Sequence, residues 1–136
     1  MRLIVNTNRI IAALIKDSYS RKIIMSKKFE LITPEFSKAE IKGHRSEVLK
    51  KSKISDAEFD KIFSSLFNKI YVIEDKAIRK KEKPARRIMD HIDPDDSPFI
   101  AASLSIENDG IWTDDPHFTK QKSVKVWKTS ELVKYF

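Results

Sequence analysis

The chain has 136 residues, of which 40% are hydrophobic, and this length and composition predict a single globular domain over residues 1–136. It has no cysteine, which excludes disulfides, thiol nucleophiles and thiolate metal sites. The formal net charge of +7 favours a polyanionic partner, whereas only two glycines argue against a Gly-rich phosphate loop and a nucleotide cofactor.

No apolar run is long enough to cross a membrane, and no signal peptide is evident at the N-terminus. We therefore expect a cytoplasmic protein without a membrane partner.

The first predicted element is an apolar run that stops at a small polar triad. Residues 3–6 predict a buried strand, and residues 9–15 predict the helix that follows it. The strand therefore delivers Asn6 to its carboxyl end, which in a parallel sheet is the edge where ligands and catalytic groups collect.

A short helix and a second strand come next, over residues 19–26 and 29–33. Pro34 then opens a further helix, because proline is tolerated in the first turn. We expect this helix to run through Glu40 towards Lys51 and to be half exposed.

The clearest helical pattern begins with the capping box of Ser55 and Glu58. An apolar stripe follows at helical spacing and is interpreted as core or interface; its members are Phe59, Ile62, Phe63, Leu66, Phe67 and Ile70. Residues 70–73 predict a third strand.

A strongly basic connection occupies residues 76–87. It is either a solvated loop entering a helix or a patch that contacts nucleic-acid phosphates. The candidate RNA-binding residues in it are Lys80, Lys81, Lys83, Arg86 and Arg87.

The last third of the chain predicts a buried, alanine-rich helix that Asp96 or Ser97 caps, followed by a strand over residues 111–113. Residues 124–129 predict a fifth strand, and Ser130 is expected to cap a short final helix. Strands that alternate with helices predict a three-layer α/β/α domain with a central parallel sheet of about five strands.

This topology gathers polar side chains at one edge of the sheet; they are Asn6, Glu40, Asp96, Asp114 and Asp115. Carboxylates that share a pocket repel one another unless a cation lies among them, and their hard oxygens suit Mg²⁺ or Mn²⁺. Such ions activate water against phosphodiesters.

Four segments carry a resemblance to a known family, in the right order and over nearly the whole chain. Residues 4–8 look like the opening "DTN" motif of PIN-domain ribonucleases, and Glu40 resembles their helical glutamate. Residues 93–102 are similar to the segment that carries the third acid, and residues 112–118 to the segment that carries the fourth.

The resemblance implies a PIN-like fold and a Mg²⁺- or Mn²⁺-dependent endoribonuclease, often the VapC-like toxin of a toxin–antitoxin pair. It implies RNA as substrate, and an antitoxin and a second copy of the chain as partners. Glu40, Asp96 and Asp115 would be metal ligands and Asp114 a further acid. Thr113 would fix the loop and Asn8 would hydrogen-bond within the site, whereas Asp93 and Asp95 would shape a turn.

The chain departs from the family pattern at one position, because Asn6 stands where the family has aspartate. An amide is a neutral and weaker ligand, so we expect this form to bind metal poorly and to be nearly inactive. Either the substitution was introduced deliberately or the protein is a degenerate member. The other motif acids are all present, which favours the first explanation.

Each candidate also has an ordinary structural interpretation. Asp96 can simply cap a helix, and Asp114 and Asp115 can simply form a turn. His44 and His117 are interpreted as surface residues. Trp112 and Trp127 are interpreted as core aromatics.

Two other function classes compete with the nuclease. A phosphoacceptor domain also gathers acids at this edge, but Asn6 and the Glu74-Asp75 pair do not supply its expected pattern. A non-catalytic RNA-binding or partner-binding module remains the alternative, and salt-dependent RNA binding without cleavage would favour it.

Overall fold

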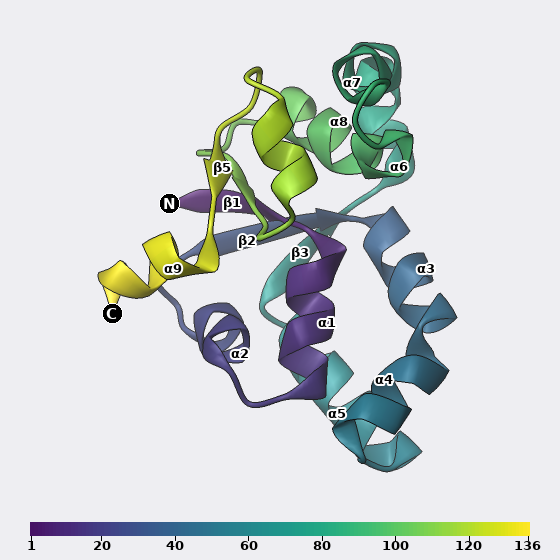
Figure 1. The fold of residues 1–136 in the computed structure, drawn as a ribbon. Coiled ribbons are helices and arrows are strands. Elements are labelled where there is room, and N and C mark those ends of the chain that lie inside the picture. The colour runs from purple at the N-terminus through teal and green to yellow at the C-terminus, as the bar shows by residue number, and fades with distance from the viewer.

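A computed structural model describes residues 1–136 and is built on one five-stranded sheet (Figure 1). All neighbouring strands are parallel, in the order β3-β2-β1-β4-β5. The strands are β1 (Arg2–Val5), β2 (Glu30–Pro34), β3 (Ile70–Ile73), β4 (Ile111–Trp112) and β5 (Val126–Trp127). Because every strand runs the same way, all carboxyl ends lie at one edge, with β1 in the centre.

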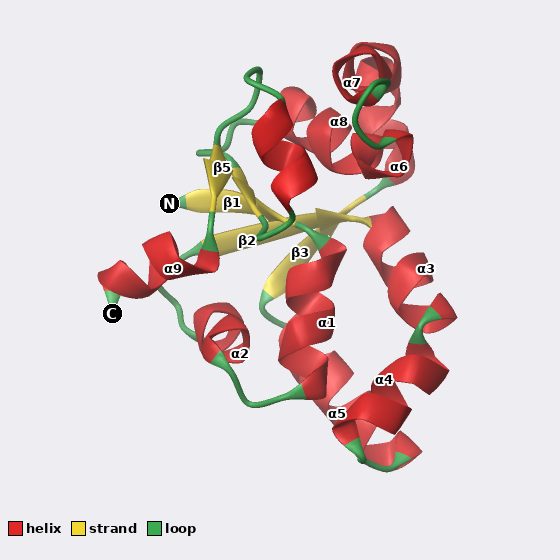
Figure 2. Ribbon diagram, in the orientation of Figure 1, coloured by secondary structure: helices red, strands yellow, loops and turns green.

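Helices cover both faces of the sheet, so the predicted three-layer α/β/α architecture is confirmed (Figure 2). One face packs against α1 (Thr7–Ile15), α2 (Tyr19–Met25), α3 (Glu35–Gly43), α4 (Arg45–Ser52), α5 (Asp56–Phe67) and α9 (Thr129–Leu132). The other packs against α6 (Asp75–Ile78), α7 (Glu82–Met89), α8 (Ser97–Ser105) and the 3₁₀ helix η3 (Pro116–Lys120). None of the helices combines the length and the hydropathy that a membrane crossing requires.

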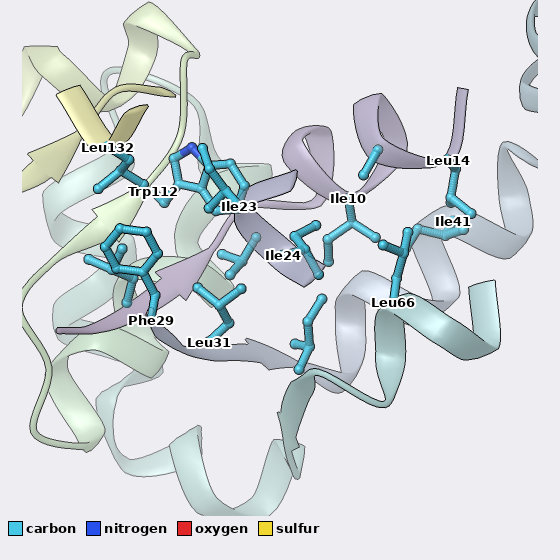
Figure 3. Packing of buried hydrophobic residues seen from close by; sticks show 14 of the residues in the cluster. Ile10, Leu14, Ile23, Ile24, Phe29, Leu31, Ile41, Leu66, Trp112 and Leu132 are labelled. Atoms are coloured by element: carbon cyan, nitrogen blue, oxygen red, sulfur yellow. The ribbon is translucent and has the colours of Figure 1, made fainter. Parts of the chain in front are cut away.

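Successive residues of the central strand pack into the hydrophobic cores on opposite faces of the sheet. Leu3 and Val5 belong to the cluster beneath α1 and α2, whereas Ile4 belongs to the cluster beneath α8. Strands that are covered on both faces are apolar at every position, which explains the uninterrupted run that opens the chain. Figure 3 shows the first cluster, in which Trp112 of β4 and Leu31 of β2 meet side chains from the helices. Complete burial of each such side chain contributes roughly 1.5–3 kcal/mol.

The helix predicted from Pro34 towards Lys51 is wrong in its continuity. Helix α3 ends at Gly43 and α4 begins at Arg45, with His44 between them at φ −102° and ψ 8°. Glycine is a poor helix former, and the break lets Val48 of α4 turn into the core, where it is 1% exposed.

The basic connection over residues 76–87 is helical rather than a loop. Helix α6, the 3₁₀ helix η1 (Arg79–Lys81) and α7 follow one another without an extended segment. Buried Ile78 and Ala85 pack against α8, so the basic side chains project from an ordered helical surface.

Two further predictions near the C-terminus are wrong in detail. The fifth strand is limited to residues 126–127, and Ser130 does not cap the last helix, because α9 already begins at Thr129. The backbone N–H of Thr129 instead donates to Asp114 Oδ1 at 2.8 Å.

Candidate metal centre

Asn6 lies at the carboxyl end of the central strand and is also the first cap of α1. Its side chain is buried, and Oδ1 accepts a hydrogen bond of 3.2 Å from the backbone N–H of Asn8. Asparagine and aspartate cap helices equally well, so either residue suits this fold. The side chain of Asn8 itself is exposed.

A relay of hydroxyl groups connects the sheet to Glu40. Thr33 Oγ1 donates to the Val5 carbonyl at 2.9 Å and lies 2.6 Å from Ser37 Oγ. Ser37 Oγ lies 3.0 Å from Thr7 Oγ1, which donates to Glu40 Oε1 at 2.6 Å. The relay fixes the Glu40 carboxylate beside the end of β1 although it comes from α3.

The environment of Glu40 disfavours its negative charge. Burial raises the pKa of Glu40 above its usual range, and the charges of Asp93 and Asp95 act in the same direction. The hydrogen bond from Thr7 and the nearby His44 oppose this rise in pKa. A cation bound at Glu40 would remove the conflict.

Asp96 occupies the first cap position of α8 but makes no capping hydrogen bond, and its Oδ2 is buried without any partner. Burial raises the pKa of Asp96 to about 7, helped by the negative charges of Asp93, Asp115 and Glu40 and opposed by His117. The carboxyl group therefore faces inward, towards other acids, instead of stabilising its own helix.

Asp115 reaches the same place from the segment after β4. Its backbone N–H donates to Thr113 Oγ1 at 3.1 Å, and its Oδ1 accepts from the His117 backbone N–H at 2.9 Å. These two bonds form the turn into η3. They leave Asp115 Oδ2 free and place Oδ1 3.5 Å from His117 Nδ1.

Asp93 both shapes a turn and faces the acids. Its Oδ1 accepts from the Asp95 backbone N–H at 3.1 Å, while its Oδ2 lies 3.5 Å from His117 Nδ1. Ligand atoms of Asp93, Asp96 and His117 lie within 4.8 Å of one another. Hard oxygens, one imidazole nitrogen and an unpaired buried oxygen of Asp96 together fit a divalent cation.

A family profile described as PIN domain matches residues 4–136 of the chain. The chain belongs to the PIN domain family. PIN domains are commonly metal-dependent nucleases that act on RNA. None of the curated proteins is similar enough in sequence to match the chain.

Both carboxylate oxygens of Asp114 in this PIN domain accept hydrogen bonds from residues outside the acidic cluster. Its Oδ2 accepts from Arg9 at 2.8 Å and from the Thr129 hydroxyl at 2.7 Å, and its Oδ1 accepts from the Thr129 backbone. Both oxygens are thus engaged in joining α1, β4 and the start of α9. This geometry gives Asp114 a structural task that the sequence did not indicate.

His117 is the residue of the cluster that sequence reasoning missed. The prediction that it is a surface residue is only half correct, because the ring is 42% exposed while Nδ1 is buried and has no hydrogen-bond partner. The signal in the sequence was its place two residues after Asp115, where an Asx turn brings the histidine back towards the acid.

The basic residues of the PIN domain predicted to bind RNA lie on η1 and α7, and all five are exposed: Lys80, Lys81, Lys83, Arg86 and Arg87. Arg86 also lines a hollow of about 170 Å³ together with Phe36 of α3 and Ser97 of α8. Since Ser97 follows Asp96 directly, the basic surface begins beside the acidic cluster.

A larger hollow of the PIN domain lies elsewhere. It measures about 650 Å³ and is lined by residues at the amino ends of the strands, among them Leu31, Ile70 and Tyr71. It contains none of the clustered acids, so it is separate from the candidate metal centre.

Proposed function

We propose that this PIN domain is an endoribonuclease that hydrolyses RNA phosphodiester bonds with Mg²⁺ or Mn²⁺, and that its Asn6 form is weak or inactive. The observation that carries the proposal is the convergence of Glu40, Asp96 and Asp115 beside the end of β1, where burial and then the neighbouring negative charges raise the pKa of Asp96. Acids held in mutual repulsion are costly for a fold, and a bound cation explains their retention.

Glu40, Asp96 and Asp115 would hold the cation. When bound, a divalent ion lowers the pKa of a coordinated water and stabilises negative charge at the phosphate. The chain's own residues do the positioning: Thr7 orients Glu40, and Thr113 fixes the turn that carries Asp115. The basic side chains of η1 and α7 would hold the RNA backbone.

Asn6 weakens this arrangement for an electrostatic reason. Its amide contributes no charge, and its Oδ1 already accepts the Asn8 N–H, so it adds little to a cation site. Aspartate at this position would keep the cap with one oxygen and offer a second, charged oxygen to the metal.

The decisive experiment restores the missing acid. We expect the Asn6→Asp variant to bind Mn²⁺ more tightly than the unmodified chain and to cleave a mixed RNA pool. A double variant, Asn6→Asp with Asp96→Asn, is the matched control and should stay inactive. Failure of folded, metal-loaded Asn6→Asp protein to cleave any RNA in the pool would count against the nuclease.

The second candidate is a non-catalytic RNA-binding module. The basic surface of η1 and α7 and the neutral Asn6 favour it. It predicts that the Asn6→Asp variant binds RNA in a salt-dependent manner but leaves it intact.

We also propose that the chain acts as the toxin of a toxin–antitoxin pair in the cytoplasm and pairs with an antitoxin or with a second copy. Helix α2 supports a protein partner, since Tyr19 is 62% exposed and Met25 is 40% exposed. The apolar stripe on α5 offers less exposed surface to a partner, because Phe59 and Leu66 are buried in the core. Light scattering of the Met25→Glu variant tests the self-association, which the charge should abolish.

A further inference from the structure

Two buried atoms at the acidic cluster lack any hydrogen-bond partner. They are Asp96 Oδ2 and His117 Nδ1. A buried polar atom without a partner costs about 1–3 kcal/mol, and a fold rarely leaves two such atoms facing one place. A shared ligand that accepts electron pairs from both atoms would satisfy them together.

We propose that the unmodified Asn6 chain holds a cation through His117 together with Asp93 and Asp96, whereas Glu40, Asp96 and Asp115 hold it when residue 6 is aspartate. The first ligand set is a mixed imidazole and carboxylate centre that prefers Zn²⁺, Co²⁺ or Mn²⁺ to Mg²⁺. The inference rests on the proposed function only in that both use the same acidic cluster. It assigns a ligand role to a histidine and an aspartate that the resemblance to PIN-domain ribonucleases left outside the metal site.

The distances suit a single ion after a small adjustment. Ligand atoms of Asp93, Asp96 and His117 lie within 4.8 Å of one another. Ligand atoms of a tetrahedral zinc site lie about 3.4 Å apart, since each bond is about 2.1 Å. The side chains are only partly buried, and a closure of up to about 1.4 Å, which rotation about their χ angles supplies, brings all three ligand atoms onto one ion.

His117 is oriented before any ion arrives. Its backbone N–H donates to Asp115 Oδ1, which holds the residue at the start of η3. Its Nδ1 then lies 3.5 Å from Asp93 Oδ2 and 3.5 Å from Asp115 Oδ1, without a hydrogen bond to either. A nitrogen equidistant from two carboxylates is placed to share a cation with them.

Asn6 strengthens the case for a histidine ligand. The amide oxygen of Asn6 carries no charge and already accepts the Asn8 N–H, so it adds little to a cation at Glu40. Asp93, Asp96 and His117 offer three ligand atoms within 4.8 Å of one another without any contribution from residue 6.

The ligand set decides which metal is preferred. Imidazole nitrogen suits zinc and the later transition metals, whereas Mg²⁺ favours oxygen ligands and retains its waters. A centre with one imidazole therefore binds Co²⁺ or Zn²⁺ more tightly than Mg²⁺, and Mn²⁺ falls between them.

The first test titrates the unmodified chain with Co²⁺ and follows its visible absorption. We expect one Co²⁺ per chain and a His117→Ala variant that binds at least about tenfold more weakly. The matched controls are His44→Ala and His91→Ala, which replace the other two histidines and should leave the affinity unchanged. Equal affinity of the His117→Ala variant and the controls would overturn the proposal, and circular dichroism confirms that each variant is folded.

The second test distinguishes ligation from a simple ion pair of protonated His117 with Asp93 and Asp115. Nitrogen-15 spectra of the histidine rings should show His117 Nδ1 moving on addition of Zn²⁺, while His44 and His91 stay in place. Zn²⁺ binding that leaves the His117 ring signals unmoved would overturn the ligand role.

Co²⁺ binding and RNA cleavage together distinguish failure of the histidine ligand from failure of the nuclease proposal. If the Asn6→Asp variant cleaves RNA equally well with and without His117→Ala and Co²⁺ binding is unaffected, the histidine ligand is wrong and the nuclease stands. If His117 binds Co²⁺ and the Asn6→Asp variant cleaves nothing, the metal centre stands and the nuclease is wrong.

Discussion

Thr7 Oγ1 donates a hydrogen bond of 2.6 Å to Glu40 Oε1, across 33 positions of sequence. The bond joins the first turn of α1 to α3, and the hydroxyl groups of Ser37 and Thr33 continue it to the backbone of β1. The Glu40 carboxylate is therefore positioned by the fold itself, before any cation is bound.

The first prediction concerns a substitution that removes this hydrogen bond. In the Asn6→Asp background, Thr7→Val should lower Mn²⁺ affinity about tenfold, because the Glu40 carboxylate loses the group that orients it. The pKa of Glu40 should rise further, since the hydrogen bond from Thr7 lowers it. Calorimetric titration measures the affinity, and carbon-13 spectra of the carboxylates measure the pKa.

Thr7→Ser is the control for this variant because it keeps the hydroxyl group. It should retain the affinity, and both variants should cost no more than about 1–2 kcal/mol of stability. An affinity that falls equally in the serine and valine variants would contradict a role for the hydrogen bond.

The second prediction concerns the pH dependence of stability. The pKa of Asp96 is about 7 in the folded chain and near 3.8 when unfolded. Between these values the unfolded chain releases a proton that the folded chain keeps, so Asp96 lowers stability as pH rises from about 4 to about 7. Above that range its full cost is present.

Asp96→Asn removes the titrating group and should therefore stabilise the metal-free chain at about pH 8. Because Asp96 is only half buried, solvent screening limits the gain to roughly 2–4 °C in Tm. The gain should disappear near pH 4, where the folded chain keeps Asp96 protonated and its charge costs nothing. Thermal unfolding in a chelating buffer measures it, and a gain independent of pH would contradict the assignment.

The third prediction is that Asp114 contributes to stability, whereas the adjacent Asp115 contributes to metal binding. Asp114→Ala removes the partner of Arg9 and of the Thr129 N–H and hydroxyl, and should cost about 1–2 kcal/mol of unfolding free energy. Metal affinity should stay within about twofold of its original value, because both Asp114 oxygens are engaged elsewhere.

Asp115→Ala, in contrast, should weaken Co²⁺ or Mn²⁺ binding by about tenfold or more. Denaturant unfolding and metal titration on the two variants measure both quantities. A strong loss of metal binding in the Asp114→Ala variant would assign that residue to the metal centre.

The fourth prediction tests the basic surface. Charge reversal of Lys80 and Lys81 should weaken binding of single-stranded RNA and reduce the slope of log K against log salt by about 0.7 for each phosphate that the variant no longer neutralises. Reversal of Lys50 and Lys61, which lie on α4 and α5, changes the net charge by the same amount. Fluorescence anisotropy over a salt series compares the pairs, and equal effects would point to net charge alone.

Much of the architecture follows from the local pattern. The apolar run over residues 3–5, the capping box at Ser55 and the alanine-rich helix after Asp96 each correspond to an element of the structure. Hydrophobic periodicity and capping act over a few residues, so the chain displays them directly. The break at His44 was missed because the glycine before it weakens a helix without forbidding it, and packing of Val48 settles the outcome.

The sequence alone determined a parallel α/β sheet and the residues that end its strands at one edge, because strand direction and helix starts are encoded locally. Only the tertiary structure decided which of those residues lie in the acidic cluster and which make structural hydrogen bonds. It engages Asp114 with Arg9 and Thr129, and it places Asp93 and His117 next to Asp96. The physical reason is that hydrogen-bond partners and burial depend on residues far away in the chain, so two adjacent aspartates with the same local signal have different surroundings.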